Sequence, residues 1–146
     1  MHPAAPTVLR LALGLLFTIF GLNGFLGFMP NPPQPPDAGA FLGAMGATGY
    51  MFPMLKSFEL CAGLLLLAGR FVPLALLMLA PIVVNIVAFS LALNPANPLA
   101  YVALAGELAV AWCYRGSFRG VLAARAEPSV GAPARDAQAV GPQFAP

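Results

Sequence analysis

The sequence predicts an all-α membrane protein built around a bundle of four transmembrane helices, and three observations support that fold class. Only 8% of the 146 residues are charged and 60% are hydrophobic, whereas about 25% of the residues in a soluble domain are charged. The mean hydropathy is +0.83. The apolar residues fall into four runs, separated by loops and turns that contain Pro. A chain of this length has room for about four short spans.

The first expected span covers residues 7–29, which are apolar apart from a few side chains such as Arg10 and Asn23. These 23 residues are enough to cross a bilayer with some tilt. A secretory signal peptide has a shorter apolar run, of about 7–15 residues, so we expect a retained helix. We also expect its glycines to let a second helix approach closely: Gly14, Gly21, Gly24 and Gly27, with Gly63 in the next span.

A Pro-rich loop and a short helix are expected between the first and second spans. Residues 30–36 include five prolines, and Pro lacks the backbone donor that a helix interior needs. A short helix then covers residues 38–47, with Asp37 where an N-cap residue would stand. Because this helix is too short to span, we expect it to lie at the membrane interface.

The other three expected spans cover residues 52–69, 72–93 and 99–114. With the first span they make one transmembrane domain over residues 1–120. From residue 121 onward the chain is rich in Ala, Gly and Pro, with almost no large apolar residue after Leu122. Such a composition cannot bury enough apolar surface to fold. Residues 121–146 are therefore expected to form a disordered cytoplasmic tail.

The positive charges predict the orientation of the bundle. Arg10, Arg70 and Arg115 stand at successive ends of the expected spans on one side, and the remaining arginines follow Arg115. The loop at residues 30–51 and the turn at residues 94–98 contain neither Lys nor Arg. Loops that carry Lys and Arg stay in the cytoplasm. Both termini and the Arg70 turn are therefore expected to be cytoplasmic.

The candidate site consists of five polar side chains within the expected spans: Asn23, Lys56, Glu59, Asn85 and Glu107. At 1.5 Å per residue they fall between the outer surface and the middle of the bilayer. A charge at the bilayer centre costs about 2.5–3.5 kcal/mol on insertion scales. We therefore expect the Asn and Glu side chains to face inward and share hydrogen bonds. Lys56 and Glu59 are three residues apart, on one helix face, and can pair.

Two interpretations of these polar groups remain open. They hold the bundle together through hydrogen bonds, or they line an outward-opening pocket for a small ligand or a proton relay, since ionisable residues inside a membrane mark functional sites by default. A further interpretation of Lys56 is that its side chain simply extends to the membrane interface. A further interpretation of Arg10 is that it serves only as a topology anchor.

The sequence lacks the signals that are typical of several classes of function. The net charge of +2 is too small to indicate a nucleic-acid partner. There is no phosphate-binding Gly-rich loop with Lys, no H-E-x-x-H and no C-x-x-C. His2 is the only histidine, which excludes a haem held by two histidines. The residues therefore indicate no metal and no cofactor, and the lipid bilayer is the one partner that they predict directly.

A series of short motifs runs through the first three spans and their turns. They occupy residues 10–17, 20–25, 48–50, 56–63, 69–70 and 81–85. Together they make residues 8–120 similar to the DoxX family of small bacterial four-helix membrane proteins. The most distinctive is Glu59 with Gly63 four residues later, followed by the Gly69-Arg70 turn.

The resemblance implies a protein of the bacterial inner membrane that is associated with a redox system. Members of the family are linked with quinone oxidoreductases and with responses to oxidative stress. On that basis Glu59, Asn85 and Glu107 are the groups that could hydrogen-bond a quinone or pass its protons. Since the sequence shows no electron carrier, a partner redox subunit would supply it, and the chain is not expected to be an enzyme on its own.

Two other functions remain open. One is a small-solute or proton-coupled transporter, which would need to form a homo-oligomer because four spans are few for that task. The other is a non-catalytic membrane scaffold or assembly factor.

Overall fold

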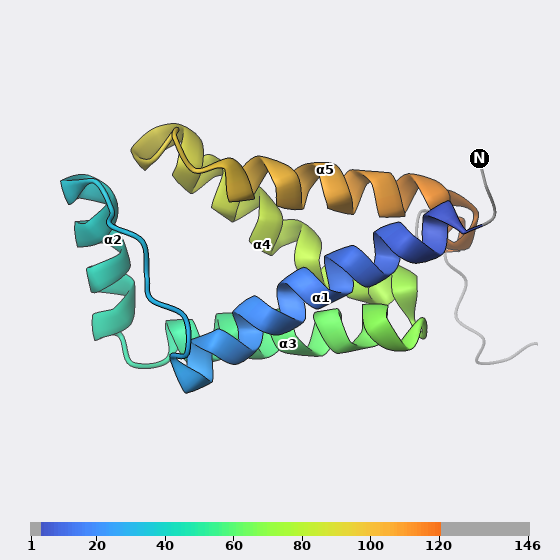
Figure 1. Ribbon diagram of the computed structural model, residues 1–146, viewed down its shortest axis with the longest axis horizontal. Coiled ribbons are helices and arrows are strands. Elements are labelled where there is room, and N and C mark those ends of the chain that lie inside the picture. The colour runs from blue at the N-terminus through green and yellow to red at the C-terminus, as the bar shows by residue number, and fades with distance from the viewer. Residues whose placement is uncertain (1–3, 121–146) are drawn as a thin grey trace, which may run out of the picture.

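The computed structural model describes residues 4–120, and within them the chain is helical (Figure 1). The expected tail at residues 121–146 lies outside the described residues. The four expected apolar segments are all helices. The elements are α1 (Ala5–Leu26), α2 (Pro36–Ala47), α3 (Met51–Ala68), α4 (Val72–Leu93), α5 (Pro98–Cys113) and a 3-10 turn, η1 (Arg115–Phe118).

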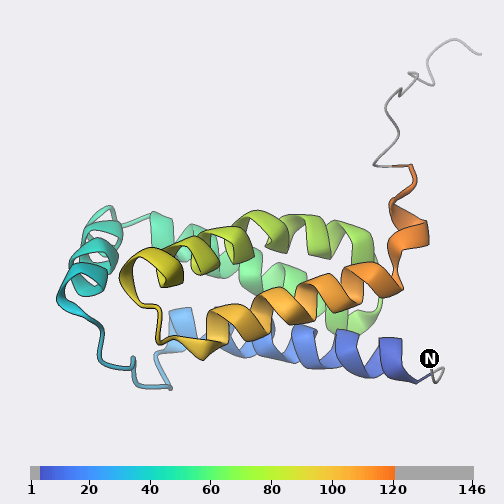
Figure 2. The ribbon, with the colours of Figure 1, turned by 90° about the horizontal axis from the view of Figure 1, so that it is seen from above.

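Helices α1, α3, α4 and α5 run side by side, and α2 lies across one end of them (Figures 1 and 2). Contacts join α1 to α3, α3 to α4, α4 to α5 and α5 back to α1. Helix α2 is held loosely. Ala38 is its one buried residue, and Phe41 packs against Phe89 of α4 with the ring centroids 5.6 Å apart.

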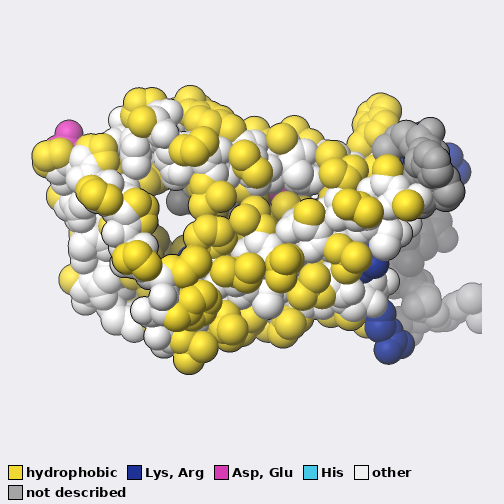
Figure 3. All heavy atoms as spheres, in the orientation of Figure 1, with side chains coloured by type: hydrophobic (Ala, Val, Ile, Leu, Met, Phe, Trp, Pro, Cys, Tyr) yellow, Lys and Arg dark blue, Asp and Glu magenta, His cyan; other side chains and the backbone are white. Residues whose placement is uncertain are grey.

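Three of these helices are long and apolar enough to cross a membrane: α1, α3 and α4. Helix α5 is apolar but has 16 residues, about 24 Å at 1.5 Å per residue. Large apolar side chains cover the outside of the molecule, among them Leu26, Leu91 and Trp112, which are at least 64% exposed. Figure 3 shows this apolar surface along the length of the helices. Such a surface suits lipid rather than water, and it supports a membrane location.

The tightest helix contact joins α1 to α3 through glycine. A Cβ on Gly63 would lie 2.6 Å from the backbone nitrogen of Thr18, and one on Gly21 would lie 2.7 Å from the nitrogen of Leu60. Gly14 approaches the backbone of α3 in the same way, whereas Gly24 lies against the side-chain stem of Lys56. The two backbones therefore meet where no side chain stands between them, as expected.

Gly27 does not belong to this contact, and its expected role in helix approach is wrong. It follows the last residue of α1 with a φ of +61°, and a Cβ there would meet nothing within 4 Å. Its backbone N–H donates to the carbonyl of Asn23. Gly27 thus ends α1 in the left-handed conformation that glycine adopts without strain.

Arg10 binds the C-terminal end of α3. Its guanidinium donates to the carbonyls of Leu66 and Leu67, near the C-terminus of α3. It also lies against Gly69, the left-handed residue that ends this helix. The last carbonyls of a helix lack intrahelical donors, and a cation there also interacts favourably with the helix dipole. Arg10 therefore joins α1 to α3, beyond any role in fixing the topology.

The expected N-cap of α2 is wrong. Asp37 lies inside the first turn, the N-cap is Pro35, and no side chain caps the helix. The fixed φ of Pro36 suits the first position of a helix, where an N–H has no partner in any case. The helix can therefore begin within the Pro-rich segment, one residue before Asp37.

Substituting Ala at Gly63 should destabilise the protein more than substituting Ala at Gly43. The new Cβ of Gly63→Ala collides with the backbone of α1, and overpacking of this kind costs about 1–3 kcal/mol. Gly43 is also inside a helix, but a Cβ there meets nothing within 4 Å, so Gly43→Ala should be neutral or slightly stabilising. Thermal unfolding in detergent micelles compares the two, and equal melting temperatures would contradict the close contact.

Candidate functional site

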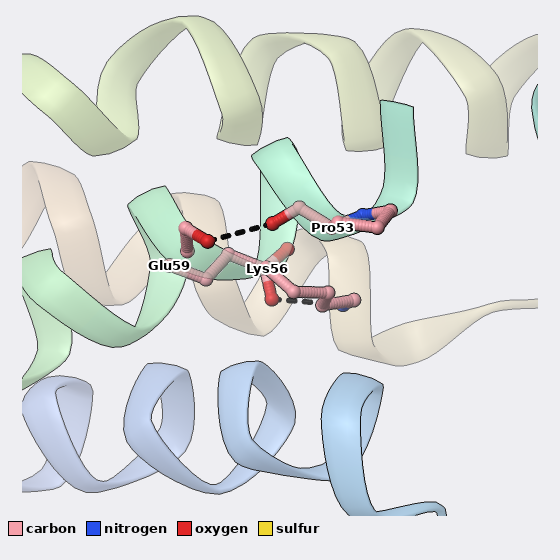
Figure 4. A network of polar contacts seen from close by, with 4 residues as sticks. Pro53, Lys56 and Glu59 are labelled. Atoms are coloured by element: carbon pink, nitrogen blue, oxygen red, sulfur yellow. Dashed lines mark hydrogen bonds and ion pairs between the residues drawn. The ribbon is translucent and has the colours of Figure 1, made fainter. Parts of the chain in front are cut away.

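An ion pair on the inner side of α3 forms the centre of the site. The Lys56 Nζ lies 2.8 Å from Glu59 Oε2 and donates a hydrogen bond to it. The side chain of Glu59 is 3% exposed and that of Lys56 is 21% exposed. Figure 4 shows the pair on α3 above the ribbon of α1, where the stem of Lys56 lies against Gly24. The i, i+3 spacing thus gives the pair that the sequence predicts.

A cavity of about 170 Å³ adjoins this pair. Its walls come from all four packed helices and are mostly apolar, with Lys56, Glu59 and Asn97 as the polar groups. Apolar cavities of about 150 Å³ in other proteins accommodate benzene. The cavity is therefore large enough for one six-membered ring. Its apolar lining is Leu16, Phe17 and Phe20 of α1, Ile86 of α4, and Leu99 and Ala103 of α5.

Asn97 lines the cavity, although its place in the sequence indicates only a turn. Its Oδ1 accepts a hydrogen bond of 3.1 Å from the backbone N–H of Leu99, so Asn97 is the N-cap of α5. Its Nδ2 lies 3.5 Å from the hydroxyl of the buried Ser90. The Asn-Pro pair at residues 97–98 is a recognisable N-cap signal, but no sequence signal places it beside the cavity.

A second polar contact joins two loops at the same end of the molecule. The Asn94 Nδ2 donates a hydrogen bond of 3.0 Å to Oε1 of Gln34. Gln34 lies in the Pro-rich loop before α2, and Asn94 ends α4. This contact ties the loop to the turn that carries Asn97.

Two of the predicted site residues lie elsewhere. Asn23 accepts a hydrogen bond of 2.6 Å from the backbone N–H of Met29, so its side chain closes the end of its own helix. Asn85 is exposed on α4 rather than facing inward as expected. Neither residue lines the cavity. The structure therefore does not gather the four predicted Asn and Glu side chains into one cluster.

Glu107 is buried on α5 but does not line the cavity. It is 7% exposed and shares the buried side of α5 with Ala103 and Val110. Ala103, one turn away, is part of the cavity wall. Within residues 4–120 no Lys or Arg forms an ion pair with Glu107. In the same range, no three or more His, Cys, Asp or Glu side chains lie close enough together to hold a metal ion.

The chemistry of the cavity follows from the donors and acceptors at its edge. A Lys ammonium has three N–H donors, and one of those on Lys56 points to Glu59. The other donors can bind an oxygen atom of a ligand. Glu59 keeps further acceptor sites for a ligand hydroxyl. The site is thus suited to a small apolar ring that bears carbonyl or hydroxyl groups.

Replacing both members of the ion pair should lower the free energy of unfolding less than replacing either one alone. Lys56→Met leaves the buried carboxylate of Glu59 without its cation, and Glu59→Leu leaves the ammonium without its anion, whereas the double variant leaves neither charge. The coupling between the two sites should reach about 1–3 kcal/mol in the free energy of unfolding. A double-mutant cycle in mixed detergent micelles measures it, and strictly additive losses would show that the pair contributes nothing.

Comparison with known proteins identifies the family. No match was found among curated proteins, and none among solved structures. The family model described as DoxX matches residues 5–90, which include α1, α2, α3, most of α4 and the Lys56–Glu59 pair. Helix α5 lies beyond the match. Since the match covers more than half of the 146 residues, the chain belongs to the DoxX family, as its motifs predicted.

Proposed function

We propose that this protein is the membrane subunit of a bacterial redox system and binds the ring of a quinone in the cavity beside Lys56 and Glu59. One observation carries the proposal: a ring-sized apolar cavity has an ion pair at its edge, inside a membrane protein. A quinone is an apolar ring with two carbonyl oxygens. The cavity offers apolar contact for such a ring, and Lys56 offers a hydrogen bond to one carbonyl.

The aromatic side chains in the cavity wall favour a flat ligand. Phe17 and Phe20 of α1 both line the cavity, and aromatic rings pack well against one another in offset or edge-to-face arrangements. A quinone ring packs against such side chains better than a flexible aliphatic chain does. The isoprenoid tail of the quinone would extend into the surrounding lipid.

Quinone reduction also needs electrons and protons. A quinone takes up two electrons and two protons to become a quinol, and a partner redox subunit would supply the electrons. Glu59 lies at the cavity and Glu107 lies one turn of α5 from its wall. These two carboxyl groups are the side chains best placed to pass protons to a bound ring. In this proposal the chain is not an enzyme without its partner.

The same proposal places α1, α3, α4 and α5 across the inner membrane, with α2 at the outer interface and both termini in the cytoplasm. Lys and Arg side chains gather at the end of the molecule where the N-terminus lies (Figure 3). Arg10, Arg70 and Arg115 stand at the ends of α1, α3 and α5, and cytoplasmic ends are rich in such residues. Trp112 lies in the last turn of the short α5, and its ring is 5.0 Å from the Arg115 guanidinium, a pair suited to the interface.

A proton-coupled transporter is the second candidate function. The observation that favours it is Glu107, a buried carboxyl group that no cation neutralises within residues 4–120. Such groups form proton relays in many transporters. Uptake of a solute by vesicles that contain only this protein would support the transporter and count against the redox subunit.

Filling the cavity should abolish quinone binding. In Ala103→Leu, the larger side chain enters the cavity from α5, and the affinity for a short-chain quinone such as decylubiquinone or a menaquinone analogue should fall at least tenfold. Ala105 is exposed on the same helix, so Ala105→Leu is the matched control and should bind as the unaltered protein does. Equilibrium dialysis of the purified protein in detergent measures both affinities.

Two results would overturn the proposed site. If the unaltered protein binds neither quinone, the proposed ligand is wrong. If Ala103→Leu binds as tightly as Ala105→Leu and has the same melting temperature, a quinone binds elsewhere on the protein.

Thiol labelling tests the four-span arrangement and its direction. In a background with Cys61→Ala and Cys113→Ala, a cysteine introduced at Asn31 should react with a membrane-impermeant maleimide in intact cells. A cysteine at Ser117 should react only after the cells are permeabilised. If α5 does not cross the membrane, position 117 lies on the same side as position 31 and both are labelled in intact cells. If the orientation is reversed, only position 117 is labelled.

A further inference from the structure

Helix α4 carries a regular stripe of exposed residues that no other described element covers. Successive members of the stripe are three or four residues apart, and all are exposed. This is the spacing of residues that share one face of a helix. The stripe is Leu74, Leu77, Pro81, Asn85, Ala88 and Ala92, and the exposed Val84 and Leu91 lie beside it.

Two polar groups interrupt this apolar stripe near the middle of the helix. Asn85 is exposed beside Val84 and stands eight residues before the end of α4 at Leu93, about 12 Å at 1.5 Å per residue. Within residues 4–120 its amide makes no hydrogen bond to another side chain or to the backbone. In addition, Pro81 has no N–H, so the carbonyl of Leu77 lacks its usual helical donor.

These groups lie inside the hydrocarbon layer if α4 crosses the membrane as proposed. Helix α4 has 22 residues and is among the helices long and apolar enough to do so. A polar group that faces lipid there has no water to bind, and unsatisfied polar groups are costly in hydrocarbon. Helix α2 supplies no hydrogen-bond partner to these groups. It meets α4 one turn beyond Asn85, where Phe41 packs against Phe89.

We infer that the exposed stripe of α4 binds a second copy of this chain, and that the Asn85 amides of the two copies hydrogen-bond to each other. Copies of one protein insert in the same direction, so the two-fold axis of a dimer runs along the membrane normal. Each residue near that axis meets the same residue of the other copy, at the same depth. A carboxamide is its own complement, because it carries both donors and an acceptor.

The residues around Asn85 suit close contact between two α4 helices. Val84 and Ala88 are small or medium-sized, and Pro81 lacks a long side chain, so the two backbones can approach at the level of the amides. Leu74 and Leu77 of the stripe and Leu91 beside it are larger and stand toward the ends of α4. A partner of another sequence could bind this stripe only with a polar group at the matching depth, a condition that a second copy satisfies automatically.

Cysteine cross-linking in lipid vesicles tests the dimer. The starting protein carries Cys61→Ala and Cys113→Ala and is reconstituted in phosphatidylethanolamine and phosphatidylglycerol vesicles at low protein density. Ala88→Cys places a thiol on the stripe, five residues from the end of α4. Val102→Cys places one at a similar depth on the exposed side of α5, where Val102 is 59% exposed. Oxidation should join Ala88→Cys into a covalent dimer and leave Val102→Cys monomeric.

The contribution of Asn85 is measured by adding substitutions to the Ala88→Cys protein. Asn85→Leu should raise the dissociation constant of the dimer about tenfold, as measured by single-molecule photobleaching across a range of dilution in lipid. Asn85→Gln keeps a carboxamide and should keep most of the affinity. Asn85→Leu is also more apolar than the original residue, so its insertion should not suffer, and its melting temperature checks the fold.

Each of three results would overturn the inference. They are a monomer at all dilutions, equal cross-linking of Ala88→Cys and Val102→Cys, and an unchanged dissociation constant in Asn85→Leu. Since the cavity is on the inner side of the helices, Ala103→Leu should leave the dimer intact. The dimer and the quinone site can therefore fail separately, and thiol labelling at position 117 tests the span arrangement independently of both.

Discussion

The close contact between α1 and α3 is the constraint on which the rest of the structure depends. Glycines on both helices remove the side chains that would separate the backbones, and this sets where every other group on these helices lies. Arg10 reaches the last carbonyls of α3. Lys56 lies along Gly24, and its ammonium remains beside Glu59. One wall of the cavity is therefore fixed by backbone geometry rather than by flexible side chains.

The same contact accounts for the burial of the ion pair. Moving two charges out of water is costly, and a buried pair is stable only when its geometry is good and its remaining polar atoms have partners. In this protein the partners are three residues apart on one helix, so neither has to be brought into place by a distant loop. Gly24 leaves room for the stem of Lys56, and the Lys56 side chain remains 21% exposed.

Features that depend on residues close together in the sequence could be predicted from it. Features that depend on which side of a helix faces the bundle could not. The helices follow from long apolar runs bounded by Pro and Gly, and the Lys56–Glu59 pair follows from its spacing. The outward position of Asn85 could not be predicted, because a helix that is apolar on all sides has no pattern to show which side faces inward. The position of Asn97 beside the cavity could not be predicted either, because the cavity arises from packing among four helices.

The position of the ion pair within a single helix also bears on how the protein enters the membrane. If the partner of a charged residue lies on another helix, the charge enters the hydrocarbon unpaired. The free-energy cost of the unpaired charge then opposes insertion. Lys56 and Glu59 can meet as soon as the first turns of α3 have formed. The segment then enters the bilayer with its two charges already neutralised by each other. Insertion of α3 can thus precede assembly of the other helices around it.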